Sequence, residues 1–150
     1  MDATEILNHY LEKCHVMQLA TEKDGQPYVC SVYFVHDEKF NLYWASWPER
    51  RHSQRILNNS KVGAAIAVNT NKNEKVSGIQ VIGAVSLCES KEEILPIARL
   101  YAEKFDMPQE WVEKFSLLKT RHRLYKLTPS VVELFDEDKF PDNPQQKIIG

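Results

Sequence analysis

Apolar residues at helical spacing open the chain, and they predict an amphipathic helix that ends near Cys14. Asp2 and Glu5 lie three residues apart, which is the spacing of a capping box at a helix start. The apolar positions of this helix are Ile6, Leu7, Tyr10 and Leu11. They fall on one face, so we expect the helix to pack against a core.

Alternating apolar and polar residues then predict strands over 15–20, 27–36 and 40–45. Asp24 and Gly25 separate the first two strands, and this pair of residues favours a tight hairpin turn. The second strand is rich in Val, Tyr and Phe, which suit a pleated sheet. We therefore expect three sequential strands in a meander.

A short helix over about 49–59 is predicted next, followed by apolar strands over 62–68 and 78–89. The polar residues 69–77 between these two strands indicate an exposed loop. Gly83 lies near the middle of the second, longer strand. A glycine there favours a bulge or the close approach of another group.

The last third of the chain begins with two helices. Ser90 and Glu93 have the spacing of a capping box and open a helix over 91–105, which we expect to pack on the sheet. A second, short helix is predicted to end near Phe115. Strand segments follow over 124–127 and 131–135.

We expect a break between these strand segments at Pro129, because proline lacks the N–H that a central strand needs. Residues 137–150 are predicted to form a tail with little to anchor it apart from Phe140, Ile148 and Ile149. Six or seven short strands, mostly joined by tight turns, favour an antiparallel closed sheet over a doubly wound one. The sequence thus predicts a mainly β fold with inserted helices, in one domain over 1–150.

The composition of the chain disfavours several classes of function. Hydrophobic residues make up 43% of the 150 residues and the net charge is −2, so a core is expected and a general attraction for nucleic acid is not. We expect no membrane span, and without a signal-peptide pattern we expect a cytoplasmic protein. Cys14, Cys30 and Cys88 are odd in number and lie in mostly apolar segments, which is more typical of reduced core residues than of a metal or redox site.

Several kinds of chemistry are disfavoured by missing motifs. The five histidines lack the spacing of a metal site, and we expect no metal. A nucleophile elbow is absent, and a pair of Cys30 and His36 does not by itself support a hydrolase. Phosphate-loop and dinucleotide fingerprints are also missing, so any phosphate contact would have to come from arginines and a helix start.

The most informative stretch is the basic turn before the short helix. Pro48 suits the first helical position, and Ser46 one turn earlier could cap the helix, which we expect to begin near Glu49. The cationic or titratable residues that follow are Arg50, Arg51, His52 and Arg55. Together with free backbone N–H groups they would form an anion site, for which phosphate is the usual ligand. The alternative is an ordinary solvated helix face.

Aromatic residues crowd the segments before this turn, and most of them suit a core. They are Tyr33, Phe34, Tyr43, Trp44 and Trp47. Ser46 and Trp47 directly precede the cationic residues. A planar ligand with a phosphate could therefore place its ring along the strand end and its anion at the helix, which is the shape of flavin mononucleotide (FMN).

These segments together resemble the FMN-binding split-barrel superfamily that includes pyridoxamine 5'-phosphate oxidase. The resembling pieces are LATEKDGQPYVCSVYFVHDEKFNLYWAS, PERRHSQRILNNSKVGAAIAV, GIQVIGAVSLCES and the ending LYKLTPSVVELFD. ERRHSQ, GIQVIGAV and the tail KFPDN are similar to a small, uncharacterised bacterial branch of short proteins. The likeness rests on the order and spacing of these pieces.

The resemblance implies a homodimer with FMN at its interface. It places the family's phosphate-binding triplet at Arg50, Arg51 and His52, and the hydroxyl that faces the ring at Ser46. A family glutamine before the barrel glycine falls nearest to Gln80. His52 stands where relatives have lysine, so we expect weaker and pH-sensitive phosphate binding, because an ordinary histidine is only partly charged at neutral pH.

The oxidase's substrate-phosphate residues and its C-terminal Arg and Pro ending have no counterpart here, so pyridoxamine 5'-phosphate oxidation itself is not expected. The preferred hypothesis is an FMN-dependent oxidoreductase acting on an unidentified small molecule, with no catalytic side chain assigned. The alternatives are a non-catalytic dimer that binds or stores flavin or another anionic ligand, and a structural dimer without a ligand.

Overall fold

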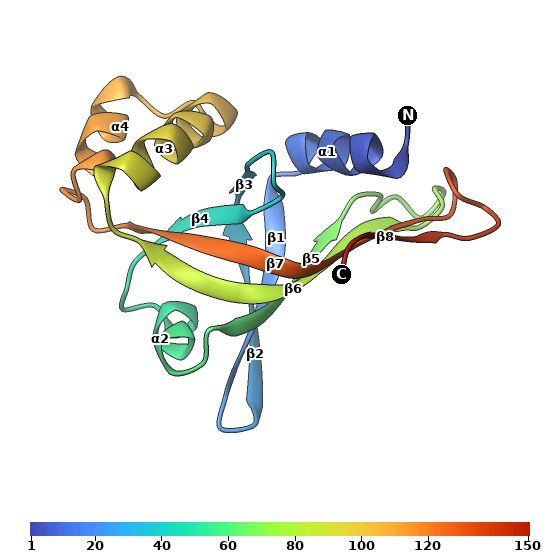
Figure 1. Ribbon diagram of the computed structural model, residues 1–150, viewed down its shortest axis with the longest axis horizontal. Coiled ribbons are helices and arrows are strands. Elements are labelled where there is room, and N and C mark those ends of the chain that lie inside the picture. Colours follow the sequence, from blue (N-terminus) through green and yellow to red (C-terminus); the bar gives the residue numbers. More distant parts are fainter.

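A single antiparallel sheet organises the chain, and helices cover parts of its two sides (Figure 1). The computed structural model describes residues 1–150. Its elements are α1 (Ala3–Lys13), β1 (Val16–Lys23), β2 (Gln26–Tyr33), β3 (Val35–His36), β4 (Leu42–Ser46), α2 (Arg51–Asn58), β5 (Lys61–Ala67), β6 (Ser77–Cys88), α3 (Lys91–Phe105), α4 (Gln109–Ser116), β7 (Arg123–Asp136) and β8 (Gln145–Ile149). The predicted mainly β, antiparallel fold is confirmed.

The strands follow the order β2-β1-β5-β6-β7-β4-β3, and β8 pairs with β7 outside this path. All the pairs are antiparallel, and the sheet curls in the manner of a split barrel. The structure has more strands than the six or seven predicted, because β3 separates from β2 and β8 forms in the tail. None of the helices combines the length and the apolar character needed to cross a membrane.

The first hairpin has the predicted turn. Asp24 and Gly25 have φ angles of 52° and 82°, the left-handed values that match a two-residue turn to the twist of β1 and β2. The predicted meander is confirmed in part. β1 pairs with β2, and residues 35–36 of the predicted second strand pair with residues 42–43 of the third, but the second strand is interrupted at Phe34. That side chain is fully buried in the core, and the following residues form β3, which pairs with β4 at the other end of the strand order.

The predicted bulge at Gly83 is confirmed. Ile82 pairs with Val131 while Gly83 pairs with Pro129, so Ser130 is an extra residue on β7. A Cβ atom on Gly83 would lie 2.2 Å from the carbonyl oxygen of Thr128, and only glycine allows this approach. The predicted break at Pro129 is wrong: β7 is continuous, since the bulge accommodates a residue that cannot donate a ladder hydrogen bond.

The tail is held by the three residues that the sequence offered as its anchors, and it also forms a strand, β8, that was not predicted. β8 pairs with β7 through partners that include Ile149 and Val132. Ile148, Ile149 and Phe140 pack against the main core. The main core lies inside the curled sheet and under α1, whose capping box between Asp2 and Glu5 is formed as predicted.

A second, smaller core lies between the sheet and the helices α3 and α4. It includes Tyr43 of β4 and Cys88 of β6, against Ile94 and Ile97 of α3. The predicted packing of this helix on the sheet is therefore confirmed, and Ser90 caps it by accepting from the N–H of Glu93. The three cysteines are free; Cys88 is buried, and Cys14 and Cys30 pack at the edge of the main core.

Candidate functional site

The site is built where β4 leaves the sheet and the chain turns into α2. Ser46 is the last residue of β4, and the N–H of Arg50 donates to the carbonyl oxygen of Trp47 over 3.1 Å to close a turn. The helix begins at Arg51, two residues later than predicted. Its N-cap residue is Arg50, which provides no capping side chain, so the predicted cap by Ser46 is wrong.

The hydroxyl of Ser46 contacts a histidine instead. Its Oγ lies 2.9 Å from Nε2 of His52, and the Ser46 residue is buried. Burial lowers the pKa of His52 below its ordinary value, and the positive charge of Arg50 lowers it further. At neutral pH His52 is therefore mainly a neutral imidazole held in place by Ser46.

Trp47 lies against two guanidinium groups. The Cζ atom of Arg121 is 3.4 Å from the centroid of the indole ring, and the Cζ atom of Arg50 is 4.4 Å from it. The ring of His122 lies 5.8 Å away, centroid to centroid. The indole N–H is buried and has no hydrogen-bond partner, which leaves a donor for an acceptor in this region.

These residues line a cavity of 420 Å³, within the usual size range of small-molecule sites, and it lies between β2, the end of β4, α3 and the loop before β7. Its lining comprises Ser31, Val32, Tyr33, Ala45, Ser46, Trp47, Arg50, His52, Tyr101 and His122. The lining combines the cationic group of Arg50 and the imidazoles of His52 and His122 with the tyrosines Tyr33 and Tyr101. The cavity is thus suited to a planar ligand with a negatively charged group.

Four of the six residues predicted from the sequence meet in this cavity: Ser46, Trp47, Arg50 and His52. Arg51 is not part of the lining. Its Cζ lies 5.1 Å from the ring centroid of Tyr28, and Arg55 lies over the same ring at 5.3 Å. These two arginines attach α2 to the first hairpin. The alternative interpretation of the basic residues, an ordinary solvated helix face, therefore describes Arg51 and Arg55 better than it describes Arg50.

Gln80 also lies apart from the cavity. It is exposed on the outer face of β6, where its register partners are Ala65 of β5 and Glu133 of β7. Within one chain, Gln80 is therefore separated from the other predicted residues.

Sequence reasoning missed His122 and Tyr101. Ser46 pairs with Arg123 across β4 and β7, and this pairing brings the preceding residue, His122, to the cavity. Burial lowers the pKa of His122, as do the charges of Arg121 and Arg50. The basic run Arg121-His122-Arg123 was visible in the sequence, but only the pairing of two strands distant in sequence shows where it lies.

This chain belongs to the pyridoxamine 5'-phosphate oxidase family, which matches it over residues 3–136. A UPF0306 protein of Yersinia pestis is 27% identical over 93 residues, covering 61% of this chain. The match spans 63% of that relative, a little under two thirds of its length. This relative fits the small bacterial branch of the superfamily that the sequence was expected to resemble.

Solved structures agree in fold. A conserved hypothetical protein of Mycobacterium tuberculosis superposes with a TM-score of 0.77 at 14% identity, covering 100% of this chain and 93% of that one. HutZ, the heme storage protein of Vibrio cholerae, superposes with a TM-score of 0.69 at 19% identity, covering 86% of this chain and 91% of that one. At such identities the likeness concerns the fold alone.

Proposed function

We propose that this chain binds FMN in the cavity beside Trp47 and uses it for a two-electron reaction on a small molecule. The supporting observation is that the guanidinium of Arg50 and the unpartnered indole N–H of Trp47 lie in one cavity, beside the imidazole of His52 that Ser46 holds. This arrangement suits a phosphate group. Bound flavin would supply the redox chemistry.

The remaining lining suits the flavin ring. Ala45 and Ser46 present the end of β4, and Tyr33 and Tyr101 offer aromatic surfaces that can stack on a planar heterocycle. The chain's own residues thus bind and orient the cofactor, and no side chain is assigned a proton transfer. Because the oxidase's substrate-phosphate residues and C-terminal ending lack counterparts, the proposed reaction is not pyridoxamine 5'-phosphate oxidation.

We further propose a homodimer that covers the outer face of the sheet. A row of small or apolar residues crosses five strands there as register partners: Val29, Ala20, Gly63, Ile82 and Val131. Val29 and Ile82 are 59% and 58% exposed, a costly arrangement in a monomer. Gln80 lies in the neighbouring row, so it would reach a flavin only across this dimer interface.

A flavin titration with arginine variants tests the FMN proposal. FMN fluorescence is followed as protein is added, with riboflavin as a ligand that lacks phosphate. We expect saturable FMN binding, weaker riboflavin binding, and at least a tenfold loss of FMN affinity in Arg50→Ala, about 1.4 kcal/mol. Arg99→Ala, on the exposed face of α3, is the matched control.

Arg51→Ala distinguishes two positions for the phosphate group. The triplet implied by the family resemblance includes Arg51, whereas the lining of the cavity does not. A loss of affinity equal to that of Arg50→Ala would favour the sequence-based triplet, whereas an unchanged affinity would favour the cavity lining. Absence of saturable FMN binding at micromolar protein would refute the proposal. If FMN binds but reduced nicotinamide nucleotides never bleach its visible absorbance, a storage role replaces the oxidoreductase.

A second candidate is storage of a planar anionic ligand such as haem, the ligand in the name of HutZ. The observation that favours it is the pair of histidines in one cavity, both with pKa values lowered by burial. Neutral imidazoles are the form that binds iron. A sharp Soret absorbance that is lost in both His52→Gln and His122→Gln would support haem, and competition with FMN would show a shared site.

A further inference from the structure

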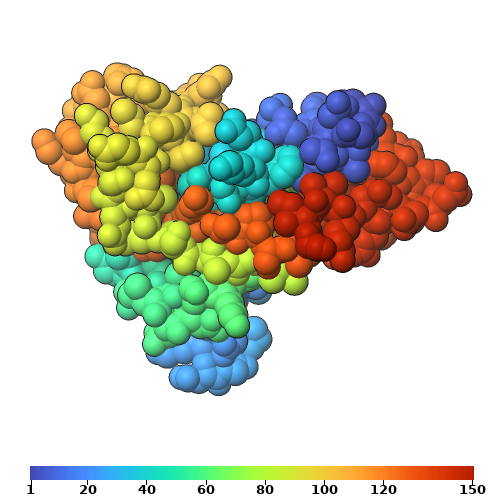
Figure 2. Space-filling view, viewed as in Figure 1, coloured from blue at the N-terminus to red at the C-terminus, as the bar shows by residue number.

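A groove of 740 Å³ separates α1 from α3 on the side of the sheet opposite α2. In Figure 2 the cyan residues around β3 lie between the blue α1 and the yellow α3. The groove is lined by Asn8, Glu12, Val35, His36, Asp37, Glu38, Pro96, Ile97, Leu100, Glu103 and Lys104. It shares no lining residue with the cavity beside Trp47, so any chemistry of the groove is independent of FMN.

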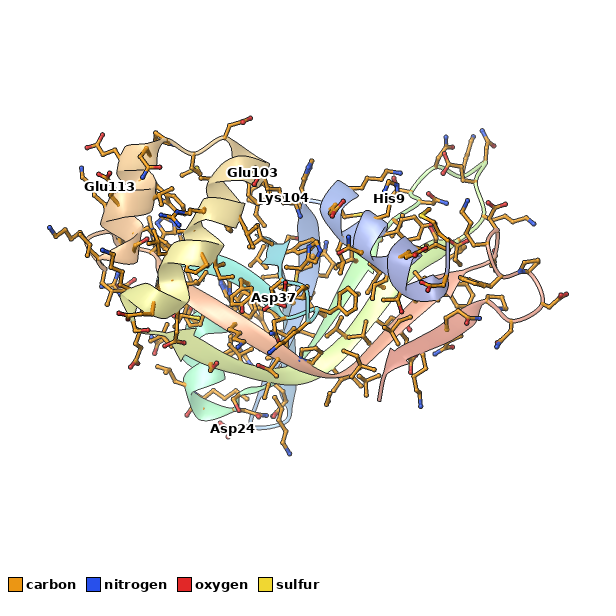
Figure 3. All side chains as sticks on the ribbon, turned by 45° about the horizontal axis from the view of Figure 1, so that its top comes forward. His9, Asp24, Asp37, Glu103, Lys104 and Glu113 are labelled. Atoms are coloured by element: carbon orange, nitrogen blue, oxygen red, sulfur yellow. The ribbon has the colours of Figure 1, made fainter.

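Lys104 is the only lysine or arginine among these lining residues, and it is partly buried. Its Nζ donates to the carbonyl oxygen of Leu11 over 3.0 Å and lies 4.1 Å from the ring centroid of Phe34. Phe34 is fully buried, so the amine rests on the apolar core. In Figure 3 the labels of Lys104 and Asp37 both fall between α3 and α1.

Burial changes the acid–base behaviour of this amine. It lowers the pKa of Lys104 to about 8, although the nearby carboxylate of Glu12 acts in the opposite direction. Roughly a fifth of Lys104 would then be the neutral, nucleophilic amine at pH 7.4, against about one in a thousand for an ordinary lysine.

The walls of the groove select among electrophiles. Carboxylates line it on both sides, with Glu12 on α1, Asp37 and Glu38 after β3, and Glu103 on α3. They would repel anionic carbonyl compounds such as 2-oxo acids. Pro96, Ile97 and Leu100 provide an apolar wall on which an uncharged aliphatic chain could lie.

We infer that Lys104 is a reactive amine that forms an imine with neutral, apolar aldehydes in the groove between α1 and α3. The lone pair of Nζ attacks the carbonyl carbon, forming a C–N bond as the C=O double bond opens, and one N–H proton passes to the oxygen to give a carbinolamine. The C–O bond then breaks as the second N–H proton is lost, so that water leaves with both protons and a C=N double bond forms. Protonated imine keeps a positive charge above the Phe34 ring and near Glu12, where the ammonium group was held before.

Reductive labelling of the unmodified protein tests the inference. The full chain is incubated with hexanal and cyanoborohydride at pH 7.4, and the occupancy of each lysine is followed by peptide mass spectrometry. Lys114 is the internal reference, because it is exposed and its Nζ pairs with Glu110 at 2.8 Å. We expect Lys104 to be alkylated at least tenfold faster than Lys114. Equal or slower labelling of Lys104 would overturn the inference.

Two further measurements separate a selective site from a merely reactive lysine. Glyoxylate, an anionic aldehyde, should lose the preference for Lys104 over Lys114, because the four carboxylates repel it. Glu12→Gln should speed the labelling by hexanal, since it removes a charge that favours the ammonium form. Glu92→Gln, on the exposed start of α3, is the control. A preference for Lys104 that is the same with both aldehydes would contradict the selectivity.

The pH dependence of the labelling rate tests the same inference independently. The groups that face Lys104 are Glu12 and Cys14 from the α1 end, His36, Asp37 and Glu38 from β3 and its loop, and Glu103 from α3. The labelling rate of Lys104 should rise with a midpoint near pH 8. A rate that parallels that of Lys114 up to pH 10 would rule the proposal out.

Discussion

The Oγ of Ser46 and Nε2 of His52 lie 2.9 Å apart at the mouth of the cavity beside Trp47. This contact holds a titratable ring beside the guanidinium of Arg50, within the site where the phosphate of FMN is proposed to bind. The ring is mainly neutral at pH 7 because burial and the charge of Arg50 lower its pKa. Anion binding in this cavity should accordingly respond both to the charge at position 52 and to pH.

A lysine at position 52 should strengthen anion binding. His52→Lys adds a full positive charge at neutral pH, and one charge near a phosphate at the protein surface is worth about 1 kcal/mol or more. We expect the FMN affinity at pH 7.5 to rise by about threefold to tenfold. Isothermal titration measures it, and His9→Lys on the exposed side of α1 is the control. A lower affinity in His52→Lys would place the phosphate elsewhere.

Acidification should strengthen anion binding in the unmodified chain. The pKa values of His52 and His122 lie below their ordinary value, so both rings are neutral at pH 7.5 and gain charge as the pH falls below about 6.5. We expect FMN affinity to rise between pH 7.5 and 5.5, and His52→Gln to reduce this rise. The same ligand is used for both proteins, so its own phosphate titration cancels in the comparison.

Without ligand, the same histidines should have the opposite effect on folding. The unfolded chain binds their protons at a higher pH than the folded protein does, so the free energy of unfolding should fall as the pH drops from about 6.5 through the lowered pKa values. Chemical denaturation at several pH values measures this fall. A stability that increases on acidification in His52→Gln and unmodified protein alike would contradict the lowered pKa values.

The outer face of the sheet should set the oligomeric state. Ile82→Glu places a charge within the row of small or apolar residues that crosses five strands, so we expect the proposed homodimer to become a monomer in light scattering. Leu57→Glu is the matched control, because Leu57 is 76% exposed on α2, away from the row. A dimer that survives Ile82→Glu but not Leu57→Glu would move the interface to α2.

Gly83→Ala should be strongly destabilising. The added Cβ would lie 2.2 Å from the Thr128 carbonyl oxygen and 2.8 Å from a methyl carbon of Leu127, so β6 and β7 must separate locally. We expect a loss of about 3 kcal/mol or more in denaturant unfolding. Gly63→Ala is the control, since the nearest atom to its added Cβ would be 3.8 Å away. Similar losses in both variants would show that the bulge is not the cause.

The anchored tail leads to a prediction about stability. Ile149 packs at the edge of the main core as part of β8, and truncating a half-buried isoleucine removes apolar contacts. We expect Ile149→Ala to lower the free energy of unfolding by about 1–2 kcal/mol. Lys147→Ala, exposed on the same strand, should change it by less than about 0.5 kcal/mol. Equal, small effects would mean that β8 contributes little.

Local signals in the sequence predicted much of this fold. The capping residues Asp2 and Ser90, the turn at Asp24-Gly25 and the bulge at Gly83 depend on neighbouring residues or on the special geometry of glycine. The meander was only partly right, because the pairing partners of strands are set by packing over long distances. The interruption of the second strand at Phe34 has no local signature.

The candidate site was predictable to a similar extent. The run from Ser46 to His52 is contiguous, and four of its residues meet in the cavity. The direction of each side chain was not predictable: Arg50 turns to Trp47, and its neighbour Arg51 turns to Tyr28. His122 enters the cavity only because β4 pairs with β7, which is a property of the whole sheet.

β6 and β7 are register partners along their lengths, yet α3 and α4 lie between them in the sequence. In folding terms the two helices are the loop of an oversized hairpin. Closing a loop costs entropy that grows only slowly with its length, by about 0.6 kcal/mol for each doubling. The helical segment can therefore change in length between related chains at little thermodynamic cost, and its early formation would shorten the distance that the two strand ends must search.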